Sequence, residues 1–136
     1  MSATISELLA RARACITRYS PEEAAEAMRR GAVLVDLRPV EYRWRFGEIP
    51  GAVAVSRHVL EWRVDVTGPW HLKELSGPDQ EIILICNEGY TSSLAAYQLS
   101  TQLGLTRVTD VEGGFAAWVA AGFPVVTRLP DQKPKS

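Results

Sequence analysis

The sequence predicts an α/β domain in which a mainly parallel central sheet carries helices on both faces, with an extra helix at the N-terminus. Short runs of consecutive apolar residues recur along the chain and are followed by polar residues, which is typical of strands buried on both faces of a parallel sheet. Stretches with helix start and stop signals separate these runs. Such an alternation of strands and helices indicates an α/β fold.

Length and composition are those of one globular domain. The chain has 136 residues, of which 46% are hydrophobic and 23% charged, and a chain of this size buries a core without a metal or a disulfide. The net charge of −1 provides no overall field that would attract nucleic acid or an anionic membrane. No apolar run has the length of about 18 residues that a membrane span needs, and none is typical of a signal peptide. We therefore expect a cytoplasmic protein that binds neither nucleic acid nor membranes.

The N-terminal region predicts a helix over about residues 2–17, because apolar residues recur there at spacings of three and four. This periodicity places Cys15 on the buried side of the helix. A second helix begins at Ser20, which is an N-cap residue followed by Pro21 and two glutamates, and it ends near Gly31.

The remaining elements follow in alternation. Strands are predicted at residues 32–36, 51–55, 82–86 and 107–110, and helices at 39–46, 59–63, 91–103 and 114–121. We divide the chain into an N-terminal helix at 1–19, a domain at 20–126 and a mobile, polar C-terminal tail at 127–136.

Cys86 ends the most apolar run, and ligands of α/β sheets bind at the carboxyl ends of strands. Backbone N–H groups in a tight loop that opens a helix favour a bound anion or a thiolate, which is the nucleophilic form of cysteine. The residues of this loop and helix start are Asn87, Glu88, Gly89, Tyr90, Thr91 and Ser92. The alternative is that Cys86 is a small core residue, as buried cysteines commonly are. The polar loop and the hydroxyl groups favour the reactive role, because a structural cysteine needs neither.

Four segments in this order resemble the rhodanese-like sulfurtransferases, and the resemblance covers about residues 20–126. They are VLVDLRPVEY at 33–42, GEIPGA at 47–52, CNEGYT at 86–91 and DVEGGFAAWVAAGFPV at 110–125. They look like the family's Asp-x-Arg strand end, its Gly-His-Ile-Pro-Gly-Ala turn with glutamate in place of histidine, its active-site loop and its closing Gly-Gly-Phe-x-x-Trp segment.

The resemblance implies a rhodanese-like fold and a double displacement at Cys86. In that reaction the thiolate takes the outer sulfur of a donor such as thiosulfate, and a thiol or cyanide acceptor then removes it from the cysteine persulfide. It also implies that the loop residues from Asn87 to Ser92 bind the substrate, and that neither a metal nor an organic cofactor is needed.

Two positions depart from related patterns. Glu88 stands where family members that act on thiosulfate commonly carry Arg or Lys, and a carboxylate within about 5 Å of a dianion opposes its binding. The natural donor is therefore left open. Related phosphatases hold phosphate with an arginine six residues after the cysteine, and here that residue is Ser92, which disfavours phosphatase and arsenate reductase chemistry.

Positive charge for an anionic substrate is expected from Arg57, which follows a predicted strand end. The alternative is that Arg57 pairs with a surface carboxylate such as Glu61.

Asp36 and Arg38 are interpreted as a structural pair at the carboxyl edge of the sheet. Tryptophans 44, 62 and 70 either fill the core or line the pocket.

Two functions remain open at this point. The first is a sulfurtransferase that uses a small sulfur donor and a thiol or cyanide acceptor. The second is a binding, sulfur-relay or regulatory module on the same fold, in which Glu88 has removed turnover and the partner is a protein donor or acceptor. The N-terminal helix could cap the domain or mediate self-association as a homodimer.

Overall fold

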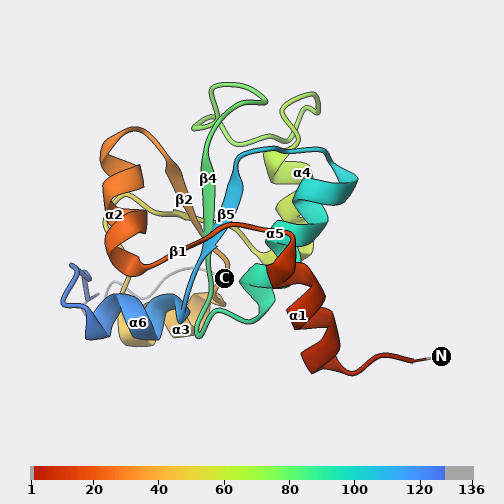
Figure 1. The fold of residues 1–136 in the computed structure, drawn as a ribbon. Helices are drawn as coiled ribbons and strands as arrows, with labels where there is room; N and C mark the ends of the chain where they lie inside the picture. Colours follow the sequence, from red (N-terminus) through yellow and green to blue (C-terminus); the bar gives the residue numbers. More distant parts are fainter. Residues whose placement is uncertain (1, 128–136) are drawn as a thin grey trace.

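A five-stranded parallel sheet organises residues 2–127, the part of the chain that this computed structural model describes (Figure 1). The strands are β1 (Arg18–Tyr19), β2 (Val33–Asp36), β3 (Val53–Ala54), β4 (Ile82–Ile85) and β5 (Val108–Val111), and their order in the sheet is β1-β5-β4-β2-β3. The helices are α1 (Ile5–Ala14), α2 (Pro21–Arg29), α3 (Val40–Phe46), α4 (Leu60–Val64), α5 (Thr91–Gln102) and α6 (Gly114–Ala120), with a short 3-10 helix at Arg57–Val59.

Each face of the sheet buries its own core, because successive side chains of a strand point to opposite faces. In β4, Ile82 and Leu84 pack with residues of α4 and α5, whereas Ile83 and Ile85 pack with residues of α2 and α6. This confirms the predicted parallel sheet with helices on both faces. No helix within the described residues is long and apolar enough to cross a membrane.

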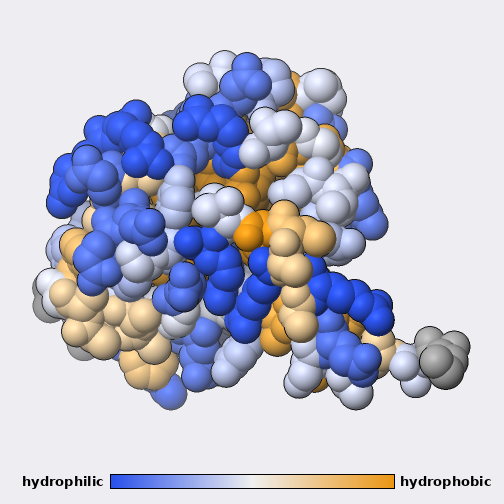
Figure 2. Space-filling model, viewed as in Figure 1, coloured by the Kyte–Doolittle hydropathy of each residue, from blue (hydrophilic) through white to orange (hydrophobic). Residues whose placement is uncertain are grey.

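Helix α1 is shorter than predicted, and its apolar stripe is poorly covered. Thr4 caps it through a hydrogen bond from the Glu7 backbone N–H at 3.1 Å, and only Ala12 is buried. Ile5 and Leu8 are 60% and 43% exposed. Figure 2 accordingly shows apolar atoms at the surface over α1, among strongly polar ones.

The prediction that Cys15 is buried was wrong, because this thiol is exposed. Helix α1 ends at Ala14 and Cys15 is its C-cap residue, and Ile5 and Leu8 of the same predicted apolar stripe are exposed as well. A periodic pattern defines a face of a helix, but it does not supply a partner for that face.

Strand β1 was not predicted. It has two residues, and its position depends on pairing with β5, in which Arg18 is the partner of Asp110 and Tyr19 of Val111. The strand predicted at 51–55 is shortened to Val53–Ala54, and the one predicted at 107–110 is shifted to Val108–Val111. The shift places Asp110 inside a strand instead of at its end. Of the predicted tail at 127–136, all but Thr127 lies outside the described residues.

A polar cluster binds β1 near the amino end of β4, which is the end opposite to Cys86. Glu81, which precedes β4, accepts hydrogen bonds from the Tyr19 hydroxyl and from Arg30 Nη2, the latter at 2.9 Å. Burial raises the pKa of Glu81, but the hydrogen bonds from Tyr19 and Arg30, together with the positive charges of Arg30 and Arg107, lower it by more, so the pKa lies below its usual value. The hydrogen bond between Tyr19 and Glu81 raises the pKa of Tyr19. Because side chains alternate along a strand, this contact of Tyr19 directs Arg18 to the face that carries α5.

Candidate functional site

Strand β4 delivers Cys86 to the carboxyl edge of the sheet, where the side chain is 5% exposed. The beginning of α6 binds the backbone carbonyls of Cys86 and of the next residue, Asn87. The N–H of Phe115 donates to the Cys86 carbonyl at 2.8 Å, and the N–H of Ala116 donates to the Asn87 carbonyl at 3.1 Å. The loop after β4 is thus attached to α6 as well as to α5.

Two glycines allow this close packing. Gly114 has φ +60°, and a Cβ atom there would lie 2.5 Å from the Cys86 carbonyl oxygen and 2.7 Å from the Gly89 nitrogen. Gly89 has φ +86°, and a Cβ atom there would lie 2.9 Å from the nitrogen of Gly113. Both positions therefore require glycine for space and for conformation.

The sulfur of Cys86 has two polar neighbours. The N–H of Gly89 donates to Sγ at 3.2 Å, and the thiol donates to Ser92 Oγ at 3.3 Å. A thiolate or a persulfide at this position would keep the hydrogen bond from Gly89 and could also accept one from Ser92. The arrangement is that of a small site for an anionic sulfur.

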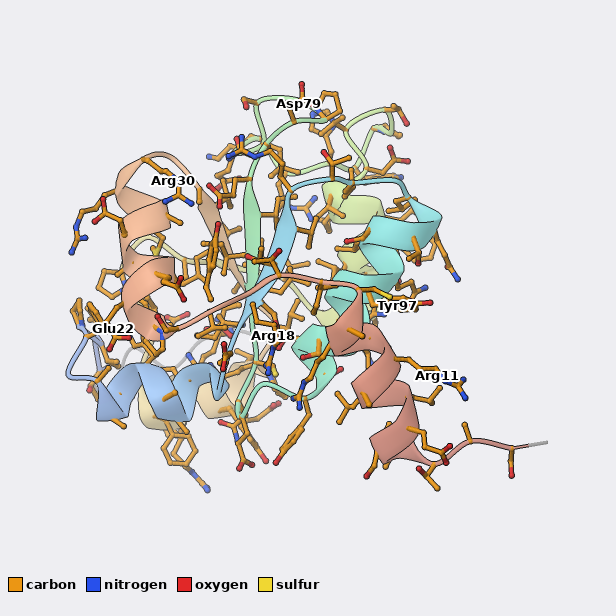
Figure 3. The ribbon with its side chains drawn as sticks, viewed as in Figure 1. Arg11, Arg18, Glu22, Arg30, Asp79 and Tyr97 are labelled. Atoms are coloured by element: carbon orange, nitrogen blue, oxygen red, sulfur yellow. The ribbon has the colours of Figure 1, made fainter. Side chains whose placement is uncertain are left out.

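Beneath the sulfur lies a buried carboxylate. Ser92 Oγ and Ser93 Oγ each lie 2.8 Å from Asp110 Oδ2, and Asp110 is fully buried. Arg18 extends from β1 (Figure 3). Its Nε lies 2.8 Å from Asp110 Oδ1, and its Nη2 lies 3.2 Å from Asp110 Oδ2. The charge of Asp110 is therefore balanced, as a buried ionised group requires.

Three of the predicted site residues come together around the sulfur, namely Cys86, Gly89 and Ser92. Asn87 contributes a backbone carbonyl that α6 binds, and its side chain is half-buried. Glu88, Tyr90 and Thr91 are exposed at the mouth of the loop.

Arg57 lies farther along the same edge. Its Nη1 is 3.0 Å from both carboxylate oxygens of Glu61, and its Nη2 donates to Gln98 Oε1 at 3.0 Å. The ion pair between Arg57 and Glu61, which was the alternative considered from the sequence, is thus present. The substrate-binding role of Arg57 stays a prediction. Arg57 also lines a pocket of about 360 Å³ together with Leu37, whose N–H donates to the Ile85 carbonyl beside Cys86.

A second hollow adjoins this pocket, because His58 lines both. It has a volume of about 440 Å³ and is walled by Trp62 and Trp70, which are 60% and 65% exposed, and by Arg63. Two of the three tryptophans of residues 44–70 therefore line a pocket. Trp44 is half-buried.

Asp36 and Arg38 form the predicted structural pair, with Arg38 Nη2 2.8 Å from Asp36 Oδ2 and both residues 2% exposed. Within residues 2–127, no three His, Cys, Asp or Glu side chains come together as a metal site.

Sequence reasoning missed four residues of the site. They are Arg18, Ser93, the buried carboxylate of Asp110, and Arg13, whose Nη2 donates to the Gly89 carbonyl at 2.7 Å. One signal was available for Asp110, because a carboxylate stands within the apolar run VTDV. No local signal exists for Arg18, which is 92 residues from its partner in the sequence.

Comparisons with known proteins show the family of this chain. The family model described as Rhodanese-like domain matches residues 20–121. A thiosulfate sulfurtransferase GlpE of Ectopseudomonas mendocina is 33% identical over 110 residues, which cover 81% of this chain and 90% of that protein.

Two solved structures share the fold. One, described as a protein of unknown function and possible tyrosine phosphatase from Rhodopseudomonas palustris, is 30% identical with a TM-score of 0.80, and the match covers 92% of this chain and 96% of that one. The other, a polysulfide-sulfur transferase homodimer from Wolinella succinogenes, is 21% identical with a TM-score of 0.72 and coverages of 93% and 90%. With its family segments in order and a matching family model over most of its length, the chain belongs to the rhodanese-like domain family.

Proposed function

We propose that this protein is a sulfurtransferase that moves a sulfane sulfur through a persulfide on Cys86. The observation that carries the proposal is the polar environment of the sulfur, which lies 3.2 Å from the Gly89 nitrogen and 3.3 Å from Ser92 Oγ. The relatives that are named thiosulfate sulfurtransferase GlpE support the reaction class.

The reaction has two displacements. The Cys86 thiolate attacks the outer sulfur of the donor, a new S–S bond forms, and the bond to the donor breaks with its electron pair on the departing group, which is sulfite when the donor is thiosulfate. An acceptor thiolate or cyanide then attacks the outer sulfur of the persulfide, and the electron pair returns to Cys86. In both steps the Gly89 N–H stabilises the negative charge on the Cys86 sulfur through a hydrogen bond of fixed geometry.

We further propose that the anionic end of the donor enters the pocket of about 360 Å³ that Leu37 and Arg57 line at the carboxyl edge of the sheet. Basic side chains of Arg43, Arg57 and His58 line it, and Ser56 adds a hydroxyl group. Arg57 keeps one carboxylate partner in Glu61, so an incoming anion would share its guanidinium group.

The partners that this function requires are a small sulfur donor and a thiol or cyanide acceptor. Both cysteines are free, which suits a reducing compartment such as the cytoplasm. Self-association stays a prediction, and the exposed side chains of Ile5 and Leu8 on α1 are the surface that could serve it.

Intact-protein mass spectrometry after incubation with excess thiosulfate or mercaptopyruvate tests the proposal. We expect a gain of one sulfur, about 32 Da, in the wild type and in Cys15→Ser, and no gain in Cys86→Ser. Cys15→Ser is the necessary control, because the exposed Cys15 thiol is also accessible to sulfur donors. An adduct that is lost only in Cys15→Ser would contradict the proposal.

A non-turnover relay or regulatory module is the second candidate, and the exposed Glu88 carboxylate at the loop favours it. No adduct from either small donor, in a protein whose Cys86 still reacts with an alkylating reagent, would support a module that receives sulfur from a protein.

The Glu88→Lys substitution is expected to raise kcat/KM for thiosulfate by about tenfold, because it replaces repulsion of a dianion by attraction near the protein surface. Steady-state assays with thiosulfate and cyanide measure the change. Asp79→Lys is the charge control, because Asp79 is also exposed but lies beside Glu81, at the end of β4 opposite to Cys86. A rate that is unchanged or lower in Glu88→Lys would show that the carboxylate does not limit the use of thiosulfate.

A further inference from the structure

Helix α1 precedes the residues that the family model matches, yet it reaches the loop that carries Cys86. Arg13 Nη2 donates to the Gly89 carbonyl at 2.7 Å, and Arg13 Nε donates to Ser93 Oγ at 3.1 Å. The guanidinium also lies 5.7 Å from the centre of the Tyr90 ring. One side chain from outside the matched region therefore contacts three residues of the loop and the start of α5.

The Gly89 carbonyl has more donors than it needs. Arg13 donates to it at 2.7 Å, Arg18 at 3.1 Å, and the Ser93 hydroxyl lies 3.2 Å away. Since a carbonyl oxygen has two lone pairs, the two guanidinium groups satisfy it without Ser93. The single proton of Ser93 is then available to Asp110 Oδ2 at 2.8 Å.

The hydrogen bond from Ser93 to Asp110 determines which acceptor the Ser92 hydroxyl can bind. Asp110 is held by two guanidinium contacts of Arg18 and by Ser93, so it does not depend on the hydrogen bond from Ser92. Ser92 has one hydroxyl proton, which points to Asp110 while Cys86 is a thiol and donates to Ser92 Oγ. Once the sulfur is ionised, the Ser92 hydroxyl can turn and donate to it, because Asp110 remains satisfied.

We propose that Arg13 is a positioning residue of the sulfur-transfer site, acting through Gly89 and Ser93 to release the Ser92 hydroxyl for the anionic sulfur. This inference rests on the proposed function only in the identity of the anion, which is a thiolate before sulfur transfer and a persulfide after it. Without Arg13, the Ser93 proton turns to the Gly89 carbonyl, Asp110 retains the Ser92 proton, and the sulfur keeps Gly89 as its single donor.

The test compares Arg13→Ala, Arg13→Lys and Arg11→Ala, all in a Cys15→Ser background. Arg11 is the matched control, because it lies on the same helix, carries the same charge and points away from the loop (Figure 3). The measurement is the rate of alkylation of Cys86 by iodoacetamide as a function of pH. This reagent is neutral, so its approach does not respond to the lost charge of the arginine, and it needs no sulfur donor.

We expect Arg13→Ala to slow alkylation at neutral pH by about tenfold and to move the midpoint of the pH profile upward, since a charge-assisted hydrogen-bond network has lost its outer member. Arg11→Ala should stay within about twofold of the parent, as a surface charge has a small effect. Arg13→Lys should be intermediate, because an ammonium group lacks the fork that contacts Gly89 and Ser93 together. The other charged groups of the loop and its hydrogen-bond network are Arg18, Asp110 and the exposed Glu88, and none of them changes in this series.

Equal profiles for Arg13→Ala and the parent would overturn the proposal, and so would an equal effect of Arg11→Ala. If Arg13→Ala also lowers the melting temperature, the Arg13→Lys variant provides the test. A stable Arg13→Lys protein with a shifted pH profile of alkylation supports the positioning role of Arg13. A stable Arg13→Lys protein with the parent pH profile refutes it. A shifted profile in a protein that forms no persulfide would contradict the proposed function and leave the role of Arg13 intact.

Discussion

The Gly114→Ala substitution is expected to destabilise the protein by about 2–4 kcal/mol and to slow persulfide formation by about 100-fold. The added Cβ would lie 2.5 Å from the Cys86 carbonyl oxygen, 2.7 Å from the Gly89 nitrogen and 2.9 Å from the Asn87 carbonyl carbon. All three are backbone atoms of the loop, so no side-chain rotation relieves the contact. The loop must move away from α6, and the Gly89 N–H moves with it, away from the sulfur.

Gly122→Ala is the matched control for this prediction. Gly122 also has a positive φ, +82°, but no atom lies within 4 Å of the Cβ that alanine would add. The Gly122→Ala variant should therefore lose only the conformational strain energy, about 1–2 kcal/mol, and keep the wild-type rate of persulfide formation. Urea unfolding and single-turnover mass spectrometry measure the two effects. A wild-type rate in Gly114→Ala would show that the loop tolerates displacement from α6.

The central sheet could be predicted from the sequence because its inner strands are buried on both faces. Such strands are continuous apolar runs, and β2 and β4 were located to within one residue. The position of Cys86 followed from the same pattern, because the polar loop starts where the apolar run ends. Local sequence was sufficient for these features because the physical cause is local.

The contacts beneath the sulfur could not be predicted in this way. Arg13 is 76 residues from Gly89 in the sequence, and Arg18 is 92 residues from Asp110. Strand β1 brings Arg18 to its partner, and a strand of two residues has no pattern of its own. The register of β1 on β5 arises only when the sheet forms, so the arginines join the site through tertiary structure.

The Arg38→Met substitution is expected to cost about 3–5 kcal/mol of the free energy of unfolding, because it leaves the carboxylate of Asp36 buried without its counter-charge. Arg38 Nη2 lies 2.8 Å from Asp36 Oδ2 and donates to the Gly47 carbonyl at 2.9 Å. Its guanidinium also lies 3.6 Å from the centre of the Phe115 ring. Arg38 thus joins the end of β2, the turn after α3 and the start of α6.

Urea unfolding of the single and double variants separates the ion pair from the packing. Since Arg38 Nη1 is buried without a hydrogen-bond partner among the described residues, the pair is incompletely satisfied. The double variant Asp36→Leu, Arg38→Met should therefore be more stable than Arg38→Met alone, as apolar replacements of buried pairs commonly are. Arg29→Met, which breaks the exposed pair with Glu26, should change stability by less than about 1 kcal/mol.

The same variants show whether this pair matters for the site. The N–H of Phe115 holds the Cys86 carbonyl at 2.8 Å, so a displaced Phe115 ring would loosen the loop even where the protein remains folded. We expect the double variant to recover stability but not the rate of persulfide formation, because methionine cannot bind the Gly47 carbonyl or stack its charge on Phe115. Recovery of both would mean that Arg38 supports the fold alone, and that the packing of α6 holds the loop without it.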